Sequence, residues 1–101
     1  MSALKEQLTE AMKNAMRAKE TARLGVIRMA LAALKQVEID ERIELDDTRV
    51  LAILDKQIKQ RQDAAKQYTD ANRQDLADVE LAEIVVLRDL MPSQLSDAEI
   101  A

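Results

Sequence analysis

The fold is decided by one stretch, Arg23-Leu24-Gly25-Val26-Ile27-Arg28-Met29-Ala30-Leu31-Ala32-Ala33-Leu34-Lys35. At 100° per residue, the larger apolar side chains share one broad arc of a helix, which carries Leu24, Ile27, Ala30, Leu31, Leu34 and Val37. A second arc carries mostly small side chains, at Gly25, Met29, Ala32 and Gln36. Only a narrow strip with Arg28 and Lys35 must face water. We therefore expect a central helix that packs on two sides.

The composition of the whole chain favours an all-α fold. Among 101 residues there is one glycine and one proline, so little in the chain breaks helices or builds hairpins. Sixteen alanines and a single aromatic residue, a tyrosine, predict a core that packs through close helix contacts. The length is that of one domain. We expect a bundle of about four helices.

Capping residues set the expected helix ends. Ser2 is a suitable N-cap for the first helix, Asp46 or Asp47 for the third and Asn72 for the fourth. The fourth helix should end before Pro92, because proline disfavours a helical conformation in the residue before it. The four expected helices span about 3–18, 21–40, 48–71 and 73–90.

The last residues predict the start of a fifth helix. Ser96-Asp97-Ala98-Glu99 has the sequence of a capping box, with serine at the N-cap and glutamate three residues later. We expect residues 1–91 to form an N-terminal helical domain. Residues 92–101 would then be a linker and the first turn of a small C-terminal helical domain that this chain lacks.

Several kinds of chemistry are missing from the sequence. There is no cysteine, which excludes thiolate catalysis and cysteine-based zinc sites, and no histidine, the commonest general base and metal ligand. We find neither a glycine-rich phosphate loop nor a Gly-x-Ser-x-Gly elbow. No apolar run approaches the roughly 18 residues that span a bilayer, and the N-terminus lacks a secretory h-region. We expect a cytoplasmic protein with no catalytic residue, cofactor, metal or membrane partner.

An acidic segment, residues 40–47, could in principle bind a hard cation. It lacks the alternating aspartates and the glycine of a calcium loop. We interpret it as a solvated loop that also caps the third helix.

Three charged residues fall within expected apolar stripes. Arg61 lies in the stripe of the third helix, and Glu80 and Glu83 lie in that of the fourth. An unpaired charge inside a protein is costly, so we expect them to form a structural ion pair with one another or with Arg23 or Arg28. The alternative is a carboxylate that works as an acid or base, which requires Glu80 or Glu83 to line a pocket.

The net charge is −4, but the basic residues are concentrated in residues 1–35 and 56–67. Such faces are either ordinary solvated helix surfaces or contacts for the phosphates of structured RNA. No aromatic residues are interleaved with them, which disfavours stacking on single-stranded bases. The candidate RNA contacts are Lys13, Arg17, Arg23, Arg28, Lys56, Lys59 and Lys66.

Seven short motifs, in order along the chain, resemble the YqeY-like family. They are Met12-Lys13-x-x-Met16-Arg17-x-Lys19, Arg23-Leu24-x-x-Ile27-Arg28, Glu41-Arg42-x-x-Leu45-Asp46-Asp47, Lys59-Gln60-Arg61, Arg73-Gln74-Asp75-Leu76-Ala77, Glu83-Ile84-x-x-Leu87 and Leu90-Met91-Pro92-x-Gln94-Leu95-Ser96. That family is related to the tail domain of the B subunit of the tRNA-dependent amidotransferases, which act on Glu-tRNA or Asp-tRNA. Asn72 departs from the glycine that the family often has there, but asparagine tolerates the left-handed conformation.

The resemblance implies two helical parts, of which the smaller C-terminal one would follow Ser96. It also implies a link to tRNA, because the amidotransferase tail helps to engage tRNA while the chemistry lies elsewhere. A carbon–nitrogen ligase activity with glutamine as the nitrogen donor would therefore belong to a larger complex.

Two functions follow as expectations. The first is a non-catalytic helical module associated with tRNA. The alternative is a protein-interaction module that docks through an apolar helical groove, with exposed apolar surface near Met91 and Leu95 as its sign.

Overall fold

Four helices make up the part of the chain that the structure, a computed structural model, describes, which is residues 2–91. They are α1 (Ala3–Arg17), α2 (Thr21–Glu41), α3 (Asp47–Asp70) and α4 (Gln74–Leu90), and these residues contain no strand. The prediction of an all-α fold with four helices is confirmed. The expected fifth helix lies outside the described residues, and so does Leu95.

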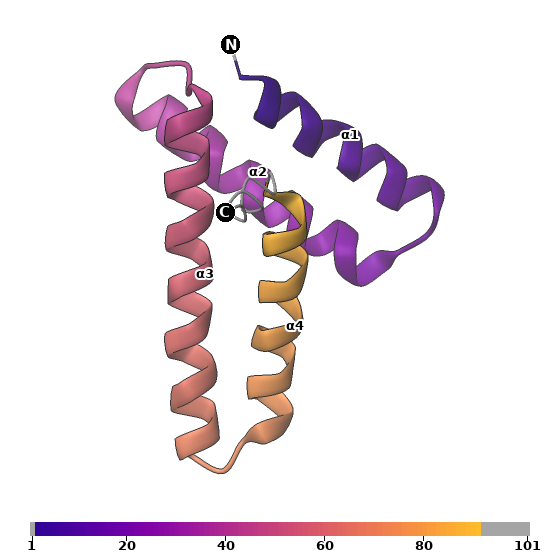
Figure 1. Cartoon of the computed structure of the whole chain (residues 1–101), viewed down its shortest axis with the longest axis vertical. Coiled ribbons are helices and arrows are strands. Elements are labelled where there is room, and N and C mark those ends of the chain that lie inside the picture. Colours follow the sequence, from indigo (N-terminus) through magenta and orange to yellow (C-terminus); the bar gives the residue numbers. More distant parts are fainter. Residues whose placement is uncertain (1, 92–101) are drawn as a thin grey trace, which may run out of the picture.

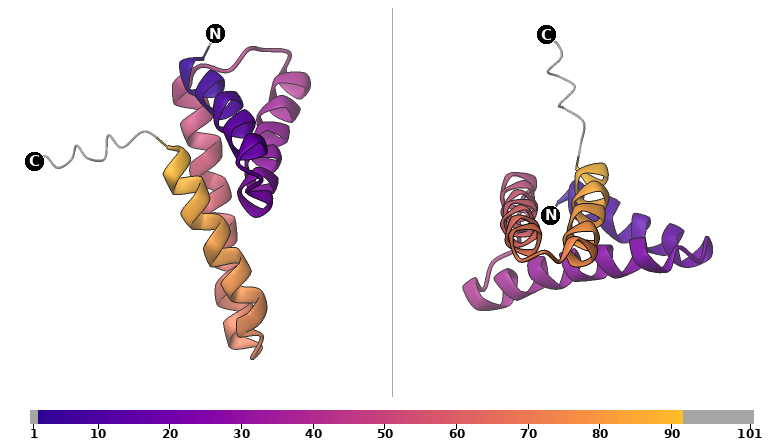
Figure 2. Two further views of the ribbon diagram at one scale, coloured as in Figure 1. Left: turned by 90° about the vertical axis from the view of Figure 1, so that its right-hand side faces the viewer. Right: turned by 90° about the horizontal axis from the view of Figure 1, so that it is seen from below.

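The helices form two antiparallel pairs (Figure 1). α3 and α4 lie side by side, and the end of this hairpin near residue 70 projects beyond α1 and α2. The other pair, α1 and α2, is more open. Figure 2 shows that α2 runs across both α3 and α4 and contacts them from one side. α2 is therefore the element on which the other three converge.

The core lies on the inner side of α2. Ile27, Ala30 and Leu34 are completely buried there, while the flanking Leu24 and Leu31 are half-buried. The opposing helices contribute the other fully buried side chains, among them Leu8, Val50, Leu54 and Leu87. The broad apolar arc predicted for the central helix is thus confirmed.

The second arc of α2 is different. Gly25, Met29, Ala32 and Gln36 are all exposed, because α1, α3 and α4 occupy the other sides of the helix. The expectation that α2 packs on two sides is wrong for the described residues. This arc is an exposed surface, which Arg61 of α3 borders at Met29.

Two of the predicted caps are confirmed. The side chain of Ser2 accepts a hydrogen bond from Lys5 N at 3.0 Å, and that of Asp46 accepts one from Arg49 N at 2.8 Å. Asn72 is not the N-cap of α4, since that position is held by Arg73. Asn72 instead turns the chain with a φ of 64°, in the left-handed region that asparagine tolerates.

Two carboxylates tie the start of α1 to the rest of the fold. Asp47 accepts hydrogen bonds from the Ser2 hydroxyl and, at 3.1 Å, from Leu4 N. Glu38 Oε2 accepts one from Lys5 Nζ at 2.6 Å and one from Leu45 N at 3.0 Å. These contacts lower the pKa of both carboxyl groups, chiefly through the Ser2 hydroxyl for Asp47 and through Lys5 for Glu38.

None of the helices within residues 2–91 has the length and apolar character needed to cross a membrane.

Candidate interaction surfaces

The free arc of α2 forms a surface that we call the α2 outer face. Its two cations are Arg28 and Lys35, and α2 carries no acidic residue between Thr21 and Val37. Met29 is 43% exposed and Ile39 is 59% exposed. A Cβ atom added at Gly25 would meet nothing within 4 Å. The face consists of Gly25, Arg28, Met29, Ala32, Lys35, Gln36 and Ile39.

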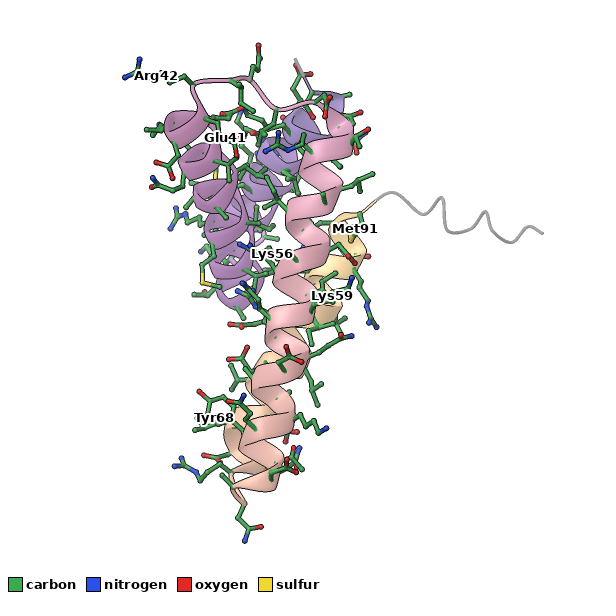
Figure 3. The ribbon with its side chains drawn as sticks, turned by 90° about the vertical axis from the view of Figure 1, so that its left-hand side faces the viewer. Glu41, Arg42, Lys56, Lys59, Tyr68 and Met91 are labelled. Atoms are coloured by element: carbon green, nitrogen blue, oxygen red, sulfur yellow. The ribbon has the colours of Figure 1, made fainter. Side chains whose placement is uncertain are left out.

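Lys56 of α3 lies beside α2. It lines a shallow groove of ≈ 220 Å³ together with Ala33 and Val37 of α2. In Figure 3, Lys56 is on the flank of α3 nearest to α2, whereas Lys59 is on the opposite flank. Within residues 2–91, Lys56, Arg28 and Lys35 are not engaged in any ion pair. Their charges are therefore available to an anionic partner.

The other candidate RNA contacts are dispersed, and several are already engaged. Arg23 Nη2 lies 2.9 Å from Asp89 Oδ2, and Lys59 Nζ lies 3.1 Å from Asp55 Oδ2. Arg17 donates to Asn14 on its own helix. Lys13 on α1 and Lys66 on α3 are exposed. The seven candidates thus lie on three helices and do not form one patch.

Lys35 was not among the candidates, although it lies seven residues after Arg28 on the same face. The signal was present in the sequence, as a strip of two cations within a stretch without acidic residues.

Arg61 and Glu83 connect α3 to α4. Arg61 Nε donates to Glu83 Oε1 at 3.1 Å, and the two side chains are 14% and 25% exposed. Glu80, one turn earlier on α4, is half-buried and makes no ion pair with any residue that the structure describes.

A groove of ≈ 300 Å³ runs between α2 and α4, and we call it the α2–α4 groove. Glu83 lines it, but its carboxylate is already bonded to Arg61. The other lining side chains are aliphatic and offer neither a nucleophile nor a group that transfers protons, so the groove suits an apolar ligand surface. They are Ala22, Val26, Val79, Ala82 and Val86.

The acidic loop does not gather a metal site. Within residues 2–91, no three acidic side chains are grouped so that they could hold an ion. Instead, Glu41 pairs with Arg49 at 3.0 Å, Asp46 caps α3 and Asp47 bonds to the start of α1. These carboxylates hold the loop in place.

The fold and the surfaces define a small all-helical protein that offers exposed helix faces and an apolar groove. The chain belongs to the Yqey-like protein family, because the model of that family matches residues 5–101. The family resemblance expected from the seven motifs is confirmed.

Yeast proteins are among its relatives. Proteins named "Altered inheritance of mitochondria protein 41, mitochondrial" are 35% identical over 97 residues in Lachancea thermotolerans and 33% identical over 100 residues in Clavispora lusitaniae. The matches cover 92% and 97% of this chain, but 51% and 58% of those relatives. An uncharacterized protein of Schizosaccharomyces pombe is 30% identical over 94 residues, which are 93% of this chain and 73% of that protein. The chain spans about half the length of most of the curated relatives it matches.

The cytoplasmic location expected from the sequence is contradicted by this comparison, since five relatives are named as mitochondrial proteins. The expectation rested on the lack of a secretory h-region and of a long apolar run. Those features separate secreted and membrane proteins from others, but they do not distinguish one aqueous compartment from another.

Proposed function

We propose that this chain is a non-catalytic helical module associated with tRNA, and that the α2 outer face contacts RNA phosphates. The observation that carries the proposal is the pair of exposed cations Arg28 and Lys35 on a stretch of α2 that has no acidic residue between Thr21 and Val37. The relation of the family to the tail of the amidotransferase B subunit supports the choice of tRNA. The names of the yeast relatives favour a mitochondrial setting.

The geometry of this face suits a phosphate backbone. Seven residues of helix place Arg28 and Lys35 about 10 Å apart along the axis. Gly25 and Ala32 lie on the same face and present little bulk, so a backbone can come close. Lys56 adds a third unpaired cation across the groove between α2 and α3. A lysine or arginine that neutralises an RNA phosphate releases condensed counterions, and these three residues need not break an ion pair within the described part of the chain to do so.

The remaining candidates contribute less in this proposal. Before they could bind a phosphate, Arg23 and Lys59 would have to break their ion pairs with Asp89 and Asp55. Lys13, Arg17 and Lys66 are exposed on other parts of the surface and would add contacts only if the RNA wraps around the domain. Any carbon–nitrogen ligase activity is proposed for a larger complex, in which this chain would bind the tRNA.

The test is a titration of labelled total tRNA with the protein, followed by fluorescence anisotropy at several salt concentrations. We expect the logarithm of the binding constant to fall linearly with the logarithm of the salt concentration, with a slope of several units. Arg28→Ala should reduce the slope by about one unit, as should Lys35→Ala.

Arg88→Ala is the matched control, because Arg88 is an exposed arginine in a helix but lies on α4. It should leave the slope unchanged. Equal effects of Arg28→Ala and Arg88→Ala would show that the α2 outer face is not the contact, and the absence of binding even at low salt would overturn the proposal.

A second function, docking of a partner protein, is favoured by the α2–α4 groove. Its lining is aliphatic except for Glu83, and one of the lining residues, Val79, is 53% exposed. An apolar groove of this kind commonly accepts the apolar face of another helix. We propose docking as the alternative to tRNA association.

A further inference from the structure

The groove between α2 and α3, which we call the α2–α3 groove, combines an unpaired cation with an unpaired hydrogen-bond acceptor. We propose that it holds a ribose–phosphate unit of RNA, a role that rests on the tRNA association proposed above. In this site Gln57 accepts a hydrogen bond from a ribose 2′-OH, and Lys56 contacts a neighbouring phosphate. The groove of ≈ 220 Å³ is lined by Ala33, Val37, Ile53, Lys56, Gln57 and Gln60.

Gln57 supplies the acceptor. Its side-chain oxygen Oε1 is buried and accepts no hydrogen bond, and it is the one buried side-chain polar atom without a partner within residues 2–91. Leaving such an atom unpaired costs free energy. The side chain as a whole is only half-buried and lines the groove, so the amide can swing outward to meet a donor there. A ligand that donates to Oε1 gains a hydrogen bond and also removes that cost.

Lys56 supplies the charge. It is exposed, it lies on the flank of α3 nearest to α2 (Figure 3), and it makes no ion pair with any residue that the structure describes. None of the described residues that line the groove is acidic. Since an amide oxygen can only accept and an ammonium group can only donate, the matching ligand carries a hydroxyl or amino donor beside an anion.

An RNA backbone presents this combination at every nucleotide. The ribose 2′-OH can donate a hydrogen bond, it lies close to the backbone phosphates, and DNA lacks it. The carbon atoms of the ribose would lie against the aliphatic part of the lining, which is Ala33, Val37 and Ile53. Ala33 is one helical turn from Met29 of the α2 outer face, so an RNA on that face is within reach of the groove. The α2–α3 groove would therefore favour RNA over DNA.

The experiment compares a tRNA transcript with the same tRNA synthesised with 2′-O-methyl groups. Methylation keeps the phosphates but removes the hydroxyl hydrogen that would be donated to Gln57. Binding is measured by fluorescence anisotropy at low salt. We expect the wild-type protein to bind the unmodified tRNA at least about fivefold more tightly than the methylated one.

Two variants in the groove separate the acceptor from the charge. Gln57→Met keeps the length of the side chain but removes the acceptor, and it should remove most of the preference for unmodified tRNA. Lys56→Ala should weaken the binding of both tRNAs and reduce the salt slope by about one unit. Gln62→Met is the matched control, because Gln62 is exposed on α3 and does not line the groove. It should keep the full preference.

The stability of Gln57→Met is a second readout. The variant should not lower the Tm, because it removes an unpaired buried oxygen and no hydrogen bond of the described fold. A Tm that is lower by several degrees would mean that Oε1 already has a partner, such as an ordered water molecule. That result would overturn the assignment of Gln57 to RNA.

The remaining outcomes separate this site from the proposed function. If the wild-type protein binds both tRNAs equally while Arg28→Ala still reduces the salt slope, the groove is not an RNA site but the tRNA association stands. The same holds if Gln62→Met loses the preference as fully as Gln57→Met does. If neither tRNA binds at low salt, both proposals fail. If AMP binds in isothermal titration calorimetry in a Gln57-dependent way while the two tRNAs bind equally, the occupant is a free nucleotide instead of RNA.

Discussion

Arg61 of α3 and Glu83 of α4 form an ion pair across the helical hairpin, with Arg61 Nε 3.1 Å from Glu83 Oε1. The same guanidinium group donates to the carbonyl oxygen of Gln57 at 3.5 Å and lies 4.0 Å from the sulfur of Met29 on α2. One side chain therefore contacts both helices of the hairpin and the helix that crosses them. This arrangement fixes the register of α3 against α4 at the point where α2 packs on them.

Replacing Glu83 with glutamine should destabilise the fold. The change keeps the shape of the side chain but leaves the largely buried charge of Arg61 without its counter-ion, which should cost about 1–3 kcal/mol. For a domain of this size each kcal/mol lowers the Tm by roughly 4–8 °C. Thermal unfolding followed by circular dichroism measures the effect.

Asp55→Asn is the control for this prediction. It breaks the Lys59–Asp55 pair, whose side chains are 71% and 52% exposed, and exposed pairs contribute roughly 0–1 kcal/mol. If Glu83→Gln has the same Tm as the wild-type protein, the Arg61–Glu83 pair does not contribute to stability.

Stability should fall in acid because of Glu38 and Asp47. The hydrogen bond from Lys5 holds the pKa of Glu38 below its ordinary value of 4.5, and that from Ser2 holds the pKa of Asp47 below 3.8. The unfolded chain therefore binds protons at a higher pH than the folded one, so the stabilisation is fully present above about pH 5 and is lost as the pH falls through the folded pKa values. Urea unfolding between pH 7 and pH 3 should show a free energy of unfolding that declines below about pH 4.5.

Glu38→Gln and Asp47→Asn should each lower the stability at pH 7 and make its decline in acid less steep. Asp75 is a useful comparison, because Arg73 lowers its pKa in a pair that is 55% and 65% exposed. Asp75→Asn should change the decline of stability in acid less than either of the other variants does, because solvent screens the exposed Arg73–Asp75 pair. If stability declines in acid identically in the wild type, Glu38→Gln and Asp47→Asn, other carboxylates cause the decline.

Leu45 should be essential for the stability of the loop between α2 and α3. It is completely buried, and its N–H donates to Glu38. Leu45→Ala removes most of a core side chain and should cost about 2–4 kcal/mol. Ile43→Ala in the same loop is the control, because Ile43 is 39% exposed and should cost much less. If Leu45→Ala and Ile43→Ala lower the free energy of unfolding equally, burial of Leu45 is not what holds the loop in place.

The contrast between Leu45 and the core of α2 shows what could be predicted from the sequence. Ile27, Ala30 and Leu34 recur with the helical period, so their burial follows from the pattern alone. Leu45 is a single apolar residue between acidic ones in a loop, and no period identifies it as part of the core. Its burial depends on how the loop closes onto the start of α1.

The surfaces were harder to predict for a related reason. A row of small residues such as Gly25 and Ala32 is compatible with a tightly packed helix interface and with an open face, and only the position of the other helices distinguishes the two. The α2–α4 groove likewise exists only because α2 and α4, which are far apart in the sequence, lie next to each other in the fold. Arg61, Glu80 and Glu83 all interrupt apolar stripes, but the hairpin register brings only Glu83 within reach of Arg61.

Replacing Gly25 with alanine should stabilise the protein. Gly25 lies in the interior of α2, where glycine is less favourable than alanine by roughly 0.5–1 kcal/mol, and the position of the new Cβ is open. We expect an increase in Tm of a few degrees, measured by circular dichroism at low protein concentration. Ala32→Gly, on the same exposed face, is the inverse control and should lower the Tm by a similar amount. A loss of stability in Gly25→Ala that grows with protein concentration would contradict the open face, because it would mean that another molecule packs closely against Gly25 in solution.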